Sequence, residues 1–135
     1  MVDAIISKDI PVLSVEELQT KSNIILLDTR TKAEYDVSHI ENAVWVLEKD
    51  LDLKSFKKFY KEQTIVVYCS VGYRSEKLVK KLLRLNFENT FNLHGGIFDW
   101  VNKGNPVEND HGVNDSIHGY DKNFACWIEK GIVIF

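Results

Sequence analysis

A cysteine stands between a strongly apolar run and an arginine in the stretch IVVYCSVGYRS, residues 65–75. The run that ends at Cys69 is typical of a buried strand, and a helical pattern begins at Ser75. A helix N-terminus carries unpaired N–H groups and a partial positive charge, so it can stabilise a negatively charged sulfur. Cys69 is therefore the candidate nucleophile, because the thiolate rather than the thiol attacks electrophiles.

The residues between Cys69 and the helix predict a loop that binds an anion. Gly72 permits an unusual backbone angle, so a loop curled around the sulfur can point several N–H groups inward. Arg74 can supply a nearby cation, or it can pair with an acid and brace the loop. The predicted binding residues are Ser70, Val71, Gly72, Tyr73, Arg74 and Ser75. The alternative, a buried core cysteine, explains the thiol but not the order of the elements around it.

Strand patterns alternate with helix patterns along the chain. Apolar runs predict strands at residues 23–28, 43–47, 64–68 and 89–93. Two capping boxes, Ser14 with Glu17 and Thr31 with Glu34, predict the starts of two short helices. Helical spacing predicts further helices at residues 51–60, 75–85 and 97–103. The alternation predicts an α/β fold with a mainly parallel sheet and helices on both faces, whose ligand sites lie at the carboxyl ends of strands.

The end of the chain differs in character from the rest. Residues 109–119 are polar and rich in turn-forming residues, which predicts a loop, and residues 120–130 predict a final amphipathic helix. The apolar residues 132–135 are expected to pack on the domain or on a partner subunit. We therefore divide the chain into one domain over residues 1–107 and a C-terminal extension over residues 108–135.

Composition narrows the class of protein. A chain of 135 residues suits one domain, and a net charge of -3 does not favour a nucleic-acid partner. No apolar window reaches the roughly 18 residues of a membrane span, and the first residues do not resemble a secretory signal. Cys69 and Cys126 form neither a disulfide framework nor a metal-ligand pattern, so we predict a reducing, cytoplasmic location with no metal and no organic cofactor.

Several motifs resemble those of the rhodanese-like sulfurtransferase family. The family's cysteine loop corresponds to residues 69–75. Residues 27–30 (LDTR) are similar to its D-x-R motif at the end of an early strand. Residues 34–43 (EYDVSHIENA) are similar to its E-[FY]…G-H-I-x-x-A segment, with Ser38 in place of the usual glycine. Residues 93–106 resemble its G-G-x-x-x-W-x-x-x-G-x-P ending.

The resemblance covers about residues 10–107 and implies a fold and a reaction. The implied fold has a central, mainly parallel, five-stranded sheet. In the implied reaction, Cys69 takes a sulfane sulfur from a small anionic donor, thiosulfate or a polysulfide, and holds it as a persulfide. A thiol, cyanide or a protein acceptor then removes the sulfur, which is a two-step covalent exchange.

The length of the cysteine loop bears on the alternatives to a small-molecule sulfurtransferase. In the related phosphatases five residues separate the cysteine from the arginine, whereas four do so here, at positions 70–73. The narrower loop favours sulfur over phosphate and argues against a phosphatase or an arsenate-reducing enzyme. A persulfide carrier that relays sulfur to a partner protein stays an alternative. Ser70, Val71 and Tyr73 are neutral where many thiosulfate-using members carry basic residues, so we expect thiosulfate to be a poor donor.

Other candidate residues have two interpretations each. Asp28 and Arg30, at the end of a predicted strand, can orient the loop or form a structural ion pair. Tyr73 either contacts the substrate or is merely exposed. His39 is expected to fix the turn that precedes the second strand rather than to act as a base. Cys126 can resolve a persulfide on the nucleophile or serve as a small packed residue.

Overall fold

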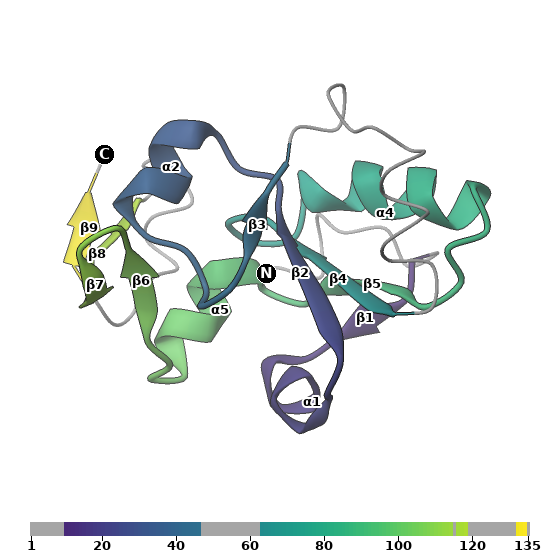
Figure 1. The fold of residues 1–135 in the computed structure, drawn as a ribbon, viewed down its shortest axis with the longest axis horizontal. Coiled ribbons are helices and arrows are strands. Elements are labelled where there is room, and N and C mark those ends of the chain that lie inside the picture. Colours follow the sequence, from purple (N-terminus) through teal and green to yellow (C-terminus); the bar gives the residue numbers. More distant parts are fainter. Residues whose placement is uncertain (1–9, 47–62, 115, 119–131, 135) are drawn as a thin grey trace.

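A five-stranded parallel sheet forms the centre of the molecule. The computed structural model describes residues 10–46, 63–114, 116–118 and 132–134. The strands of the sheet are β1 (Val12–Leu13), β2 (Ile24–Asp28), β3 (Val44–Trp45), β4 (Thr64–Tyr68) and β5 (Thr90–Leu93). Their spatial order is β1-β5-β4-β2-β3, and every neighbouring pair is parallel (Figure 1). The predicted α/β class and the five-stranded parallel sheet are confirmed.

The described helices are α1 (Val15–Thr20), α2 (Lys32–Val37), α4 (Ser75–Arg84) and α5 (Gly96–Asn102). Of these, α1 and α2 begin where their capping boxes predict. At α1, the Ser14 hydroxyl accepts the Glu17 N–H at 3.1 Å, and the Glu17 carboxylate accepts the Ser14 N–H at 3.1 Å. Thr31 and Glu34 repeat this reciprocal pair at α2. Both predicted capping boxes are therefore confirmed, since each satisfies donors that a helix start would leave unpaired.

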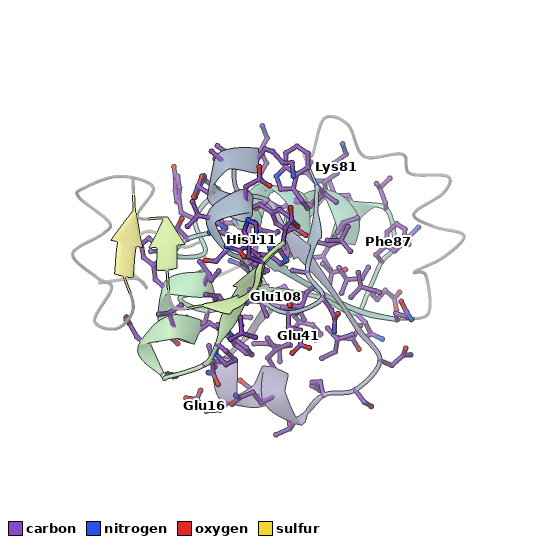
Figure 2. All side chains as sticks on the ribbon, turned by 60° about the vertical axis from the view of Figure 1, so that its left-hand side comes forward. Glu16, Glu41, Lys81, Phe87, Glu108 and His111 are labelled. Atoms are coloured by element: carbon purple, nitrogen blue, oxygen red, sulfur yellow. The ribbon has the colours of Figure 1, made fainter. Side chains whose placement is uncertain are left out.

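Helices cover both faces of the sheet. In Figure 1, α4 lies on one side of the strands and α1 on the other, and in Figure 2 Lys81 of α4 and Glu16 of α1 lie on opposite sides of the view. The side chains of β4 alternate between the two layers, as a strand period of two requires. Ile65 and Val67 pack with the apolar face of α4, whereas Val66 and Tyr68 pack with α1 and α5.

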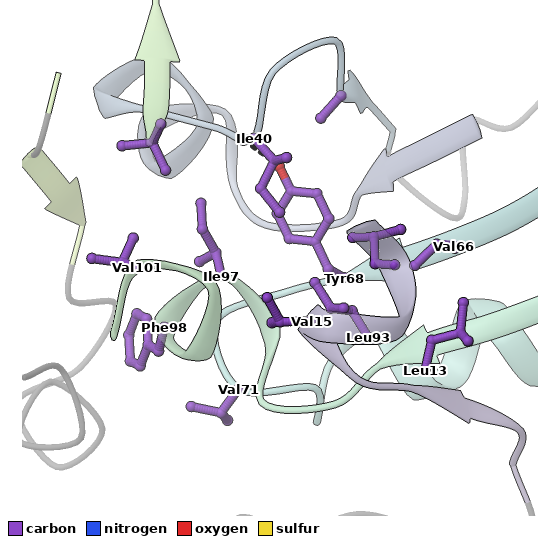
Figure 3. Close-up of a cluster of buried hydrophobic side chains, with 13 residues drawn as sticks. Leu13, Val15, Ile40, Val66, Tyr68, Val71, Leu93, Ile97, Phe98 and Val101 are labelled. Atoms are coloured by element: carbon purple, nitrogen blue, oxygen red, sulfur yellow. Dashed lines mark hydrogen bonds between the residues drawn. The ribbon is translucent and has the colours of Figure 1, made fainter. Parts of the chain in front are cut away.

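The layer beneath α1 and α5 holds the larger of the two apolar clusters (Figure 3). Its members include Val15 from α1, Val66 and Tyr68 from β4, and Ile97 and Phe98 from α5, each no more than 2% exposed. Since β4 is buried on both faces, its nearly continuous apolar sequence is explained. The loop that follows β4 therefore starts from a strand that is packed on both faces.

The second predicted strand is shorter than its sequence pattern. Residues 43–47 predict a strand, but β3 spans only Val44–Trp45. It lies at the sheet edge and pairs only with the last two residues of β2, Leu27 and Asp28. The strand pairing ends with β2 at Asp28, although the Val46 N–H still donates to the Asp28 carbonyl at 3.0 Å. Residue 47 lies outside the described residues. The helix predicted at residues 51–60 lies outside the described residues.

The polar segment after residue 106 is largely strand, so the loop predicted at residues 109–119 is wrong for its described part. β6 (Val107–Asn109) and β7 (Gly112–Asn114) form an antiparallel hairpin. Its turn accounts for the polar sequence, because the Asn109 side chain accepts the His111 N–H at 2.8 Å and Gly112 has a φ of 111°. The turn signals marked a hairpin rather than an irregular loop.

Two short strands end the described chain. β8 (Ser116–His118) pairs in parallel with β9 (Ile132–Ile134), and β8 lies beside α2. The backbone of Ile132–Ile134 pairs with β8, and the packing expected of the apolar end stays a prediction. The helix predicted at residues 120–130, with Cys126, lies outside the described residues. The boundary at residue 107 stays a prediction. Among the described helices, none is both long and apolar enough to cross a membrane.

Candidate active site

The cysteine loop lies at the carboxyl end of β4, between that strand and α4. Cys69 directly follows β4, and α4 begins at Ser75. Because β2 and β5 flank β4, their carboxyl ends bring Asp28 and the residues after Leu93 to the same edge of the sheet. The Cys69 residue is only 1% exposed, and it is a free cysteine. The sulfur therefore lies at the floor of the loop rather than on an open surface.

Hydrogen-bond donors of the loop face the sulfur. The Gly72 N–H donates to Cys69 Sγ at 3.1 Å, and the Ser75 hydroxyl lies 3.5 Å from the same atom. Gly72 has a φ of 100°, a conformation that favours glycine and allows the loop to turn its N–H inward. Both donors and the N-terminus of α4 stabilise negative charge on Sγ. The loop can therefore hold a thiolate or a persulfide anion.

The N-terminus of α5 holds the first two carbonyl groups of the loop. Ile97 N–H donates to Cys69 O at 3.0 Å, and Phe98 N–H donates to Ser70 O at 3.0 Å. Gly96 lies so close that a Cβ there would collide with the backbone of both loop residues. This close approach explains the glycine at position 96. These backbone contacts fix the loop against α5.

Arg74 pairs with an acid, which decides between the two interpretations of its role. Its guanidinium donates to the two carboxylate oxygens of Glu34 at 2.7 and 2.8 Å. It also donates to the Ser70 hydroxyl at 2.6 Å, so both ends of the loop are joined to α2. Glu34 is 1% exposed. Arg74 thus braces the loop, and its charge is largely balanced by this carboxylate.

The charge of Glu34 is maintained by its neighbours. Burial alone raises the pKa of Glu34, but the hydrogen bond and the charge of Arg74 outweigh burial, so that this pKa falls from 4.5 to about 2. The Thr31 N–H also donates to the carboxylate, at 3.1 Å. Sequence reasoning missed Glu34 as a site residue. Its capping box was visible, but the contact with Arg74 joins residues 40 positions apart.

Asp28 and Arg30 form a buried ion pair. Arg30 Nη2 lies 2.7 Å from Asp28 Oδ2, and neither side chain is exposed. Arg30 also donates to the Ser38 carbonyl at 2.6 Å, and the Tyr68 hydroxyl donates to Asp28 at 2.8 Å. Burial, followed by the charge of Asp28, raises the pKa of Tyr68 well above its usual value, so its hydroxyl stays protonated. These contacts brace β2, β4 and the segment after α2.

Ser38, which replaces the glycine of the resembled motif, fits its position without strain. Its φ of −173° is an extended conformation that any residue adopts. His39 stacks on the Tyr35 ring with centroids 3.9 Å apart, and its backbone pairs with Glu108 of β6. This histidine therefore supports the segment between α2 and β3, as expected.

Two loop side chains point in different directions. Val71 is 4% exposed and belongs to the apolar cluster with α5, whereas Tyr73 is 59% exposed. Beside the loop lies an open pocket of about 470 Å³. Its lining includes Tyr73, Arg74, Glu76, Lys77 and Lys80. Val71 is thus a packing residue in this structure, and Tyr73 lies at the outer surface of the loop.

Asn92 also contacts the loop, and sequence reasoning missed it. This β5 residue is fully buried, and its side chain reaches Gly72 and Ser75. The available signal was a polar residue inside a strand pattern (TFNL), since a buried amide needs partners. In the described ranges, no three side chains of His, Cys, Asp or Glu gather as ligands for a metal ion.

Family comparison agrees with this geometry. Residues 12–103 match the family described as "Rhodanese-like domain". The chain belongs to the rhodanese-like domain family. The matched segment contains β1 to α5, the cysteine loop, Glu34 and Asn92. The predicted family membership is therefore confirmed.

Curated relatives of this rhodanese-like chain include larger proteins named tRNA uridine(34) hydroxylase. The protein from Wigglesworthia glossinidia brevipalpis is 34% identical over 87 residues, which are 61% of this chain and 28% of the relative. The protein from Yersinia enterocolitica is 32% identical over 97 residues, which are 66% of this chain and 27% of the relative. The chain spans less than a third of the length of these relatives.

Solved structures share the fold. A protein from Bacillus halodurans superposes with a TM-score of 0.66 at 25% identity, covering 78% of this chain and 81% of that one. A rhodanese-related protein from Thermoplasma volcanium gives a TM-score of 0.63 at 26% identity, covering 72% of this chain and 96% of that one. A thiosulfate sulfurtransferase from Pseudomonas aeruginosa, at 24% identity and a TM-score of 0.66, covers 76% of this chain and 21% of that one, and shows the fold alone.

Proposed function

We propose that this protein is a sulfurtransferase that carries a sulfane sulfur on Cys69. The observation that carries the proposal is the Gly72 N–H at 3.1 Å from the sulfur, within a loop braced by Arg74 and α5. A donor aimed at Sγ stabilises a thiolate before reaction and a persulfide after it. Cys69 is 1% exposed, so the loop encloses the sulfur on which the persulfide would form.

The reaction balances as two displacements. The Cys69 thiolate attacks the outer sulfur of the donor, the sulfur–sulfur bond of the donor breaks, and the leaving group departs with the electron pair. For thiosulfate the leaving group is sulfite, and for a polysulfide it is the shortened polysulfide. An acceptor thiolate or cyanide then attacks the outer sulfur of the persulfide, which releases the Cys69 thiolate and a new persulfide or thiocyanate.

We further propose that a polysulfide or a protein persulfide is a better donor than thiosulfate. Ser70, Val71 and Tyr73 add no cation to the loop, and the charge of Arg74 is balanced by Glu34. Thiosulfate is a dianion, so it gains less from this loop than from one with free basic side chains. The thiolate chemistry suits a reducing location, for which we propose the cytoplasm.

Intact-mass measurement tests the proposal. The reduced protein is incubated with thiosulfate and, separately, with polysulfide. A gain of one sulfur atom that cyanide reverses and that Cys69→Ser abolishes is the expected result, with faster loading from polysulfide. Cys126→Ser is the control for the second thiol and should still load. If neither donor adds sulfur to Cys69, the sulfurtransferase proposal is overturned.

The same measurement separates an enzyme from a relay module. An enzyme releases its sulfur to cyanide or small thiols over many turnovers. A relay module loads once and releases sulfur quickly only to a specific protein acceptor. Loading without turnover on small acceptors would therefore support the relay alternative. A phosphatase or an arsenate reductase is disfavoured by the four-residue spacing, and hydrolysis of a generic phosphoester would revive that alternative.

The hydroxylase relatives suggest a second candidate, in which this chain takes part in the hydroxylation of a tRNA uridine by an external two-electron oxidant that supplies the oxygen atom. Its basis is the 34% identity over 87 residues. The chain matches only 28% of that relative, and its net charge of -3 does not favour an RNA surface, so sulfur transfer comes first. Detection of hydroxylated uridine in a digest of tRNA incubated with the protein would support this second candidate.

A further inference from the structure

Asn92 contacts the cysteine loop with both ends of its side-chain amide. Its Nδ2 donates to the Gly72 carbonyl at 2.8 Å, and its Oδ1 accepts the Ser75 hydroxyl at 2.5 Å. The residue lies in β5, next to β4 in the sheet, and it is fully buried. Burying a side-chain amide among mainly apolar neighbours costs free energy of folding unless the amide makes hydrogen bonds. Here both partners are residues of the loop that holds Cys69.

The hydrogen bond from Asn92 to the Gly72 carbonyl is one of three that fix backbone carbonyls of the cysteine loop. Backbone N–H groups of α5 hold the carbonyls of Cys69 and Ser70, and the Asn92 amide holds that of Gly72. No peptide bond in the described chain is cis, so each N–H lies opposite the carbonyl of its own peptide unit. The N–H groups fixed in this way are those of Ser70, Val71 and Tyr73, and each points away from the partner of its carbonyl. The bond to the Gly72 carbonyl also holds in place the residue whose own N–H donates to Cys69 Sγ.

The second bond controls the only described side-chain hydroxyl at the sulfur. Ser75 Oγ has one proton, and it lies 2.5 Å from Asn92 Oδ1 but 3.5 Å from Cys69 Sγ. With that proton on Asn92, a lone pair of Oγ can accept the S–H of a neutral thiol. When the sulfur is anionic, the hydroxyl can rotate and donate to it. Asn92 thus holds Ser75 Oγ in place for either state of the sulfur.

We propose that Asn92 is a positioning residue for the Cys69 sulfur. It acts through Gly72 and Ser75 rather than by contact with Sγ, and it sets the donors that stabilise an anionic sulfur. Its role in sulfur transfer rests on the proposed function. Its effect on the reactivity of the thiol does not, because any electrophile reports that reactivity.

The test is the pH profile of alkylation at Cys69 by iodoacetamide, followed by mass analysis of the peptide that carries it. Asn92→Leu keeps the branching at Cγ and makes neither hydrogen bond. We expect alkylation at pH 7 to be about tenfold slower and the pH midpoint to rise by about one unit. Asn92→Asp, which presents an acceptor to the Gly72 carbonyl in place of a donor, should shift the midpoint in the same direction.

Thr90→Val is the matched control. Thr90 lies two residues earlier in β5 and is equally buried, but its hydroxyl donates to the Phe87 carbonyl, away from the loop. This variant should lose stability to urea without moving the pH midpoint of alkylation. If a general weakening of β5 caused the shift, Thr90→Val and Asn92→Leu would change the pH profile of Cys69 alkylation by the same amount. A folded Asn92→Leu or Asn92→Asp protein with the wild-type midpoint overturns the proposal, as does an equal shift in Thr90→Val.

Sulfur loading distinguishes this inference from the proposed function. If the wild-type protein does not gain sulfur while the Asn92 variants shift the alkylation midpoint, the sulfurtransferase proposal fails and the positioning role stands. If the wild-type protein gains sulfur and the Asn92 variants alkylate as it does, the positioning role fails alone.

Discussion

Arg74 and Glu34 form a bidentate ion pair between the cysteine loop and α2, with nitrogen–oxygen distances of 2.7 and 2.8 Å. The arginine that closes the loop is therefore braced by a carboxylate, which balances its charge. Of the groups described at the site, the backbone N–H of Gly72, the Ser75 hydroxyl and the start of α4 are those that stabilise a charged sulfur.

Glu34→Gln tests the brace. The amide keeps the size of the side chain but removes the charge that balances Arg74, so we expect a loss of about 1–3 kcal/mol in the free energy of unfolding by urea. Asp36→Asn is the matched control on the same helix. It breaks an ion pair with Lys32 whose side chains are both more than half exposed, and should cost less than about 0.5 kcal/mol. Equal losses in the two variants would contradict the assigned role of Glu34.

Stability at low pH should depend on the same carboxyl group. Since folding lowers the pKa of Glu34 from 4.5 to about 2, the folded protein binds fewer protons there than the unfolded chain. This contribution, roughly 3 kcal/mol, is complete above pH 4.5 and is lost as the pH falls toward 2. The free energy of unfolding, measured with urea between pH 5 and pH 2, should therefore fall more steeply with decreasing pH for the wild-type protein than for Glu34→Gln. Parallel curves would show that another group dominates this window.

Gly96→Ala should disrupt the contact between α5 and the cysteine loop. A methyl group there meets the carbonyls of Cys69 and Ser70, and the φ of 58° adds strain. We expect the free energy of unfolding, measured with urea, to fall by roughly 3 kcal/mol or more. We also expect slower alkylation of Cys69. Gly112→Ala separates strain from collision, because Gly112 has a φ of 111° but open space around its Cβ position. Gly112→Ala should lower the free energy of unfolding by only about 1–2 kcal/mol and leave the rate of Cys69 alkylation unchanged.

Tyr73→Lys tests whether a neutral loop limits the use of thiosulfate. Tyr73 is 59% exposed, so a lysine can be accommodated without repacking and adds a cation beside the loop. Sulfur loading from thiosulfate should become several-fold faster, and the gain should shrink as salt is added. Tyr73→Gln removes the ring without adding charge and should show no salt-dependent gain. An equal gain in both variants would mean that the ring, not the charge, limits loading.

Local patterns in the sequence determined most of the elements and the position of the candidate nucleophile. The capping boxes at Ser14 and Thr31 and the apolar run before Cys69 each lie within a few residues, so their meaning does not depend on distant contacts. The turn signals at residues 109–112 were equally local, but a hairpin and an irregular loop share them. Whether flanking strands pair is decided by where the neighbouring backbone lies.

The tertiary structure alone decided the partners of the loop. Sequence order does not reveal that β5 and β2 flank β4, and this arrangement brings Asn92 beneath Gly72 and Glu34 beside Arg74. Each contact joins residues 20 to 40 positions apart. A cysteine, a glycine and a helix start can be recognised as a group because they are adjacent in the chain. The buried amide and carboxylate that hold them in place are found only once the sheet has assembled.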